Sequence, residues 1–249
     1  MDSPLQADVR HAVDYDKIMF FFVSLRETGV DSLPIFSPSI LLSYKEVPRM
    51  RHWLANMLLK LFGWRAVGSL ADQPKCVVIV APHTSNWDFP VMLLLAFALR
   101  LKVTWMGKHT LFRPPFGGIM RRLGGLPINR GTRHNMVQQA ISSFLSHDQL
   151  ALAILPEGTR QRTPYWRSGF YHIALGAQVP IALGFADYRR KVGGIGRVIV
   201  PSGDVDADMA LIRDFYSGIT GKRSEQFGEI RLKSQAEATT TERTPTALD

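Results

Sequence analysis

The chain has 249 residues, of which 46% are hydrophobic and 20% charged, so it is long enough for one large domain with an ordinary core. Its single cysteine, Cys76, excludes an intramolecular disulfide framework and a cysteine-rich metal site, and fits a reducing, cytoplasmic setting. No run of about 18 or more apolar residues is present, and the apolar run of residues 18–25 is short and preceded by acids. The sequence therefore predicts neither a transmembrane helix nor a signal peptide.

The formal net charge of +9 is concentrated in the middle of the chain. Between Phe89 and Ala186 the acids are Asp148 and Glu157, against eleven basic residues: Arg100, Lys102, Lys108, Arg113, Arg121, Arg122, Arg130, Arg133, Arg160, Arg162 and Arg167. This bias indicates an anionic partner, and nucleic acid, phospholipid or a phosphorylated substrate would each satisfy it. A solvated basic face is the alternative.

Residues 1–47 are weakly patterned and predict no role, whereas residues 48–66 predict an amphipathic helix. Apolar side chains recur there at helical spacing with basic ones between them: Trp53, Leu54, Met57, Leu58, Leu61 and Phe62. Tryptophan, phenylalanine and basic residues on one helix suit a membrane interface. Packing of the same helix on its own domain is an equally good interpretation.

The stretch that follows places a histidine and an aspartate at a strand-to-helix junction. Residues 76–81 predict a buried β-branched strand, and residues 91–99 predict a helix. On a helix, five positions advance about 500°, so His83 and Asp88 would face apart unless His83 lies on a loop before the helix. Pro90 and the capping residues place the helix start between Ser85 and Phe89.

A carboxylate that reaches the His83 ring would fix its tautomer and stabilise its protonated form, which would make His83 a general base. The alternative is that His83 is an ordinary loop histidine and Asp88 only a helix cap.

The rest of the chain alternates strands and helices up to about residue 222. Strands are expected at residues 102–106, 126–130, 150–155, 180–185 and 196–200, and helices at 119–123, 134–145, 169–177 and 209–219. This alternation predicts a single α/β domain over residues 67–222, with a mainly parallel central sheet flanked by helices. Residues 223–249 are polar and are expected to be a disordered tail.

Polar clusters follow four of the expected strands, and ligands of such folds gather at the carboxyl ends of the strands. The clusters are His83/Asp88, Lys108, Asn129/Arg130 and Glu157/Arg160. Their convergence favours a catalytic site with a base and several cations on one rim of the sheet.

With these clusters in order, residues 50–220 resemble the glycerolipid acyltransferase family, typified by bacterial 1-acylglycerol-phosphate acyltransferases. The four blocks that carry the resemblance are His83 with Asp88, the glycine-rich approach Gly124–Arg130, Glu157–Gly158–Thr159–Arg160, and Val179–Pro180–Ile181. A lysine, Leu-Phe and proline-glycine pattern at Lys108, Leu111, Phe112, Pro115 and Gly117 accompanies them. Pro82, Asn129 and Gln161 depart from residues frequent in the family, and these departures concern the acceptor rather than the reaction.

The resemblance implies transfer of an acyl group from a thioester to the hydroxyl of a lysophospholipid. The acceptor that it favours is 1-acylglycerol-3-phosphate, which would give phosphatidate. It implies His83 as general base and Asp88 as its partner. Substrate contacts would come from Lys108, Arg130, Glu157, Gly158, Thr159 and Arg160, the three cations holding the phosphate. Glu157 would bind acceptor hydroxyls or hold a neighbouring arginine.

No cofactor or metal is expected, because acyl-CoA or acyl carrier protein supplies the acyl group as a substrate. The expected location is the cytoplasmic face of the membrane, as a peripheral or monotopic protein. Two alternatives stay open: an acyltransferase for another lysolipid, either a lyso-aminolipid or one with a larger head group, and a non-catalytic membrane-binding protein. A nucleic-acid-binding module would explain the charge but not the His-Asp junction, so no nucleic-acid partner is expected.

Overall fold

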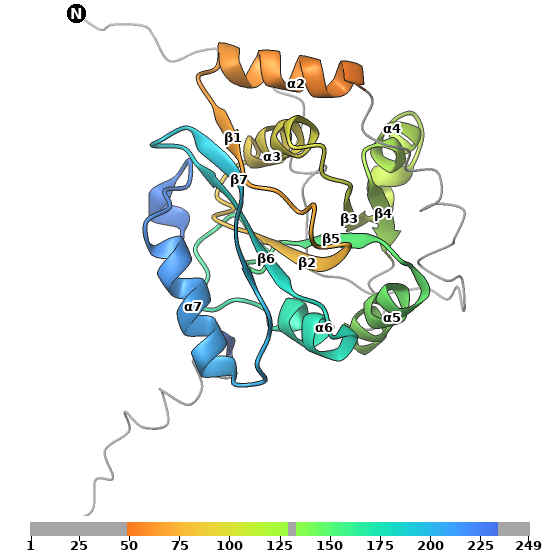
Figure 1. The fold of residues 1–249 in the computed structure, drawn as a ribbon, viewed down its shortest axis with the longest axis vertical. Helices are drawn as coiled ribbons and strands as arrows, with labels where there is room; N and C mark the ends of the chain where they lie inside the picture. Colours follow the sequence, from red (N-terminus) through yellow and green to blue (C-terminus); the bar gives the residue numbers. More distant parts are fainter. Residues whose placement is uncertain (1–48, 129–132, 234–249) are drawn as a thin grey trace, which may run out of the picture.

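The computed structural model describes residues 49–128 and 133–233 (Figure 1). The elements, with the labels of Figure 1, are α2 (Arg49–Leu61), β1 (Arg65–Val67), β2 (Lys75–Val80), α3 (Asp88–Ala98), β3 (Val103–Lys108), the 3-10 helix η2 (His109–Phe112), α4 (Gly117–Arg122), β4 (Gly125–Ile128), α5 (Arg133–Ser146), β5 (Leu150–Ile154), α6 (Gly169–Ala177), β6 (Ile181–Asp187), β7 (Val192–Ile199), α7 (Val205–Ser217) and the 3-10 helix η3 (Ser224–Gln226).

Seven strands form one sheet in the order β1-β7-β6-β2-β5-β3-β4. The β6–β7 pair is antiparallel and the other neighbours are parallel. The expected α/β domain with a mainly parallel sheet is therefore confirmed. β2 lies at the centre, and its run of β-branched residues suits a strand that is covered on both faces.

Alternate side chains of β2 enter two different cores. Val77 and Ile79 face the cluster that includes residues of α5, α6 and α7. Cys76, Val78 and Val80 face the side on which Met92 of α3 packs. Figure 1 shows the same division, with α3 and α2 on one side of the sheet and α5 and α6 on the other. The carboxyl end of β2 is thus held from both faces.

The helix expected from residues 48–66 is present as α2, and one of its sides packs on its own domain. Its buried residues, Ala55 and Leu59, pack with α3. Leu58 is half-buried. The other large apolar side chains of α2, and Phe62 just after it, are exposed: Met50, Trp53, Leu54, Met57, Leu61 and Phe62. Among the described residues, no helix is both long and apolar enough to cross a membrane.

The expectation that a disordered tail begins at residue 223 is wrong for residues 223–233. Ile230 and Leu232 are buried in the main core, and Leu232 forms an isolated parallel β-bridge with Trp166. The Trp166 backbone amide also donates to the Arg231 carbonyl at 2.7 Å. Two isolated apolar side chains and backbone pairing hold this polar segment, which composition alone does not reveal. Residues 1–48 and 234–249 lie outside the described residues.

Candidate active site

The loop between β2 and α3 is closed by the carboxylate of Asp88, the first residue of α3. One oxygen of this carboxylate, Oδ2, accepts hydrogen bonds from the backbone amides of Thr84 and Ser85 at 2.7 and 2.8 Å. The same oxygen lies 3.2 Å from Nδ1 of His83. The helix therefore begins within the predicted interval, His83 stands on the loop before it, and the two side chains meet as the spacing required.

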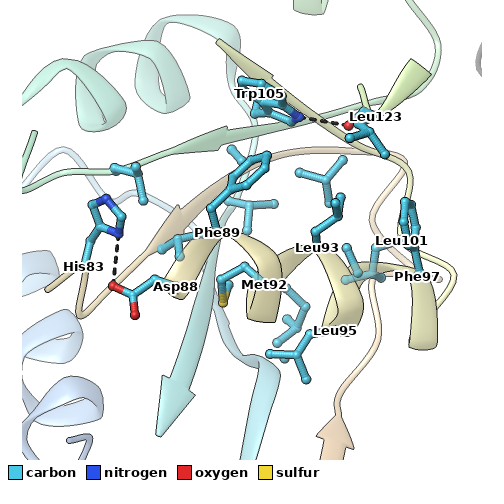
Figure 2. Close-up of a pocket in the computed structure, with 18 residues that line it drawn as sticks. His83, Asp88, Phe89, Met92, Leu93, Leu95, Phe97, Leu101, Trp105 and Leu123 are labelled. Atoms are coloured by element: carbon cyan, nitrogen blue, oxygen red, sulfur yellow. Dashed lines mark hydrogen bonds and ion pairs between the residues drawn. The ribbon is translucent and has the colours of Figure 1, made fainter. Parts of the chain in front are cut away.

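The His83–Asp88 pair is buried: His83 exposes 3% of its surface and Asp88 exposes 2%. Figure 2 shows Nδ1 directed at Asp88 and the other ring nitrogen on the far side of the ring. That nitrogen, Nε2, is buried without a hydrogen-bond partner in the part of the chain that the structure describes. A neutral imidazole whose proton is on Nδ1 presents at Nε2 a lone pair for an incoming proton. This geometry suits the predicted general base held by a carboxylate.

Glu157 reaches the same loop from the carboxyl end of β5. Its Oε1 accepts from the backbone amide of His83 at 2.6 Å, across 74 positions of sequence. Burial raises the pKa of Glu157 to about 8, and the nearby negative charge of Asp88 adds to this rise. The hydrogen bond from the His83 amide has a smaller effect in the opposite direction. Glu157 is therefore largely protonated at neutral pH, and it positions the His83 backbone without placing a second full charge beside Asp88.

The other members of the Glu157–Arg160 block form a tight turn. Gly158 has φ +66°, and a Cβ there would lie 2.5 Å from Nε of Arg167, so both its backbone angle and its surroundings require glycine. Thr159 Oγ1 accepts from the Gln161 amide at 3.2 Å, a local turn contact. Arg160 follows on the same loop, partly buried. The sheet order thus brings this block to the edge that carries His83.

Of the other predicted cations, Lys108 belongs to β3, the strand beside β5. Lys108 is the last residue of β3, whose carboxyl end lies at the same edge as that of β5. Arg130 lies outside the described residues, just after β4. The expected convergence on one rim therefore holds for His83, Asp88 and the Glu157–Arg160 block, and by strand position for Lys108.

An apolar cavity of about 120 Å³ begins at the His83–Asp88 pair and runs beneath α3 (Figure 2). Apart from the pair itself, its walls are apolar side chains and glycine backbone. They come from β2, α3, the α3–β3 loop, β3, the residue after α4, β5 with the residue that follows it, and β7: Val78, Val80, Phe89, Met92, Leu93, Leu95, Ala96, Phe97, Leu101, Val103, Trp105, Leu123, Ala153, Leu155, Gly194 and Ile195. Such a cavity suits a hydrocarbon chain whose reacting end lies at His83.

Residues 221–226, which we call the C-terminal strap, cross the His83 loop, and no sequence pattern predicted this contact. The Arg223 amide donates to Thr84 Oγ1 at 3.1 Å, and a Cβ on Gly221 would lie 2.8 Å from the same oxygen. The Gln226 amide, in its better-satisfied orientation, donates to the carbonyls of Thr84 and Arg160 at 3.0 and 2.6 Å. The strap thereby ties the His83 loop to the Glu157–Arg160 block.

Tyr188, the residue just after β6, is a further site residue that no sequence pattern indicated. Its ring meets Trp64 edge to face at 5.0 Å. Burial, and then the charge of Asp88, raise the pKa of its hydroxyl far above the usual range. The Asp88 carboxylate therefore sits beside a phenol that stays protonated.

Residues 68–182 match the family model described as Acyltransferase. This match supports a glycerolipid acyltransferase family. The match covers β2 to the first residues of β6 and so contains the His83 loop and the Glu157–Arg160 block, but not β7, α7 or the C-terminal strap.

A curated relative, the 1-acyl-sn-glycerol-3-phosphate acyltransferase of Haemophilus influenzae, is 28% identical over 135 residues, which are 50% of this chain and 54% of the relative. The chain thus spans about half the length of the curated relative that it matches. Among solved structures, the 1-acyl-sn-glycerophosphate (LPA) acyltransferase PlsC of Thermotoga maritima aligns with a TM-score of 0.46 and 18% identity, covering 66% of this chain and 73% of that one. At that similarity the alignment carries no functional argument.

Proposed function

We propose that the protein transfers a fatty acyl group from an acyl thioester to the hydroxyl of a lysophospholipid, with 1-acylglycerol-3-phosphate as acceptor and phosphatidate as product. The observation that carries the proposal is the buried His83–Asp88 pair at the head of an apolar cavity. The family and the name of the Haemophilus relative support the same reaction class.

In the proposed reaction Nε2 of His83 takes the proton of the acceptor hydroxyl as its oxygen attacks the thioester carbon. The C–O bond forms, the C–S bond breaks, and the imidazolium returns its proton to the leaving thiolate. Asp88 keeps Nδ1 protonated and stabilises the imidazolium, and base catalysis of this kind contributes about 10²–10⁴-fold. No cofactor is needed, because the donor, acyl-CoA or acyl carrier protein, is a substrate.

The acyl chain would lie in the cavity beneath α3, where apolar walls replace water along the chain. The phosphate of the acceptor would be held by the cations expected at the rim, Lys108, Arg130 and Arg160, since arginine offers bidentate contacts to phosphate. Gly158 would let the backbone approach the acceptor closely, and Thr159 would line the same turn.

The exposed apolar face of α2 supports association with a membrane surface, where the lipid substrates reside. Trp53, Leu61 and Phe62 are exposed by 64%, 74% and 59%, with Arg49, Arg51 and Lys60 on the same helix. An interfacial helix of this composition would place the protein at the cytoplasmic face as a peripheral protein.

The test is acyl transfer by the purified full chain in detergent micelles, from a long-chain acyl thioester to a panel of lysolipids, beside His83→Ala. Transfer to lysophosphatidate that His83→Ala abolishes is the expected result. Transfer to another lysolipid would keep the mechanism and replace the acceptor. Absence of transfer from either carrier by a folded protein would refute the proposal and favour a non-catalytic membrane-binding role.

A further inference from the structure

The segment 113–122, which contains α4, carries an exposed patch that the proposed chemistry does not use. Phe116 and Ile119 are exposed by 62% and 52%. Arg113, Arg121 and Arg122 are exposed within the same segment. We call these five residues the α4 patch.

Packing and hydrogen bonds in the residues around the α4 patch fix its position at the surface. Phe112, just before it, is buried and packs on Trp105 with ring centroids 6.0 Å apart. A Cβ on Gly117 would lie 2.0 Å from the Phe112 carbonyl oxygen, so the turn into α4 is as tight as a glycine allows. The amides of Gly117 and Met120 donate to the carbonyls of Arg113 and Phe116 at 2.9 and 3.0 Å. The exposed phenylalanine therefore stands on an anchored, hydrogen-bonded turn.

Charge and composition identify the kind of partner. The sequence contains no aspartate or glutamate from residue 89 to 147, so no nearby acid in sequence offsets the three arginines. Exposed large apolar residues flanked by arginines match an anionic bilayer interface, where apolar side chains enter the acyl boundary and cations meet the phosphates. Nucleic acid would use the arginines but gives no reason to expose an isoleucine.

The position of α4 fits the same partner. Figure 1 shows α4 and α2 at the same end of the molecule. The residue just after α4, Leu123, lines the cavity that leads to His83. We propose that the α4 patch is a second contact with an anionic lipid bilayer, acting with the exposed face of α2 and bringing the bilayer to the wall of the cavity. The proposal rests on the proposed function only in taking a bilayer as the source of the substrates.

A site-specific fluorescent label tests this directly in the full chain. Cys76, the single native cysteine, is fully buried and burial raises the pKa of its thiol to about 12, so a cysteine introduced at Ile119 can be labelled selectively with an environment-sensitive dye. Val200, which is exposed by 76% just after β7, provides the matched control as Val200→Cys.

With vesicles of phosphatidylcholine and phosphatidylglycerol, we expect a blue shift for the label at 119 and none at 200. A label at 119 that stays in water while the protein sediments with the vesicles would overturn the proposal and leave the acyl-transfer activity untouched. A label at 119 that is already in an apolar environment before vesicles are added would also overturn it, because the chain itself would then cover the patch.

Sedimentation with the same vesicles measures the charge contribution. Arg122→Gln should weaken binding about fivefold, the effect of one arginine near an anionic surface, whereas Arg197→Gln, an exposed arginine on β7, should not. Phe116→Ser with Ile119→Ser should weaken binding more than Leu145→Ser with Val200→Ser, a pair of similarly exposed residues elsewhere. All four variants should keep wild-type transfer in micelles. Equal binding by patch and control variants, or loss of the micellar activity in the patch variants alone, would contradict a bilayer contact.

Discussion

The carboxylate of Asp88 is the contact on which the proposed mechanism depends, and Asp88→Asn separates its two roles. Oδ2 accepts from two backbone amides and faces His83 Nδ1. An asparagine oxygen can still accept the two amides, so the loop should survive. Exchanging charged for neutral hydrogen bonds costs about 1–3 kcal/mol of unfolding free energy in total.

Catalysis should suffer far more than stability. If the amide oxygen keeps the hydrogen bonds from the Thr84 and Ser85 amides, His83 Nδ1 faces a neutral oxygen instead of a carboxylate. The imidazolium then loses the charge that stabilises it. If the amide turns its NH₂ group towards the ring, it favours the tautomer with the proton on Nε2, which cannot accept the hydroxyl proton. In a Ser-His-Asp triad the same change lowers kcat about 10⁴-fold, so we expect a loss of 10³–10⁴-fold, or about 4–5.5 kcal/mol of barrier.

The assay is the initial rate of thiol release from a long-chain acyl-CoA with lysophosphatidate in micelles, together with the urea denaturation midpoint. Asp208→Asn is the matched control, because Asp208 is equally buried and accepts from Tyr171 Oη and from the Ser202 amide and hydroxyl. It should lower the midpoint and leave the rate per folded molecule unchanged. An Asp88→Asn rate within about fivefold of wild type would refute the role assigned to Asp88.

Three further predictions follow from the same site. Burial raises the pKa of Glu157 to about 8 from 4.5, so the folded chain keeps a proton that the unfolded chain releases. The free energy of unfolding of the wild type should therefore fall as the pH rises from about 5 to 8, by at most about 1.4 kcal/mol per pH unit. Denaturation of Glu157→Gln should lack this pH dependence, and equal slopes for the two proteins would contradict the prediction. Ala153→Leu fills the cavity wall, so long-chain donors should lose rate while a short-chain donor keeps it; uniform loss would place the chain elsewhere. Gly221→Ala puts a methyl group 2.8 Å from Thr84 Oγ1, which should displace the His83 loop. The transfer rate should fall by a factor of about 10 to 100, while the thermal midpoint stays nearly unchanged. A wild-type rate would show that the strap does not position the loop.

Much of the fold could be predicted because its signals are local. The β-branched run before His83 specified a buried strand, and the helix start near Asp88 followed from Pro90 and the capping residues. β7 was harder: the sequence indicated residues 196–200, but the strand begins at Val192. Glycines have low strand propensity, yet a Cβ on Gly193 would lie 2.8 Å from the Phe185 carbonyl oxygen, so close packing requires glycine where propensity argues against a strand.

The candidate site divides in the same way. Residues close in sequence, His83 and Asp88, could be paired from their spacing, because the loop geometry is set by a strand end and a helix start. The bond of Glu157 to the His83 amide spans 74 positions and depends on β2 and β5 being neighbours, which no local pattern specifies. The strap lies farther still from the loop in sequence, and its contacts use a glycine, backbone amides and a glutamine that carry no motif. Long-range contacts through backbone groups therefore mark the limit of sequence reasoning here.

The measurement closest to the central claim is single-turnover acyl transfer to lysophosphatidate by wild type and His83→Ala, at equal folded concentration in micelles. If His83 removes the proton of the acceptor hydroxyl, wild type transfers the acyl group and the variant is slower by at least about 10²-fold, with an unchanged denaturation midpoint. A His83→Ala rate equal to that of wild type would show that the buried pair at the head of the cavity does not carry the chemistry.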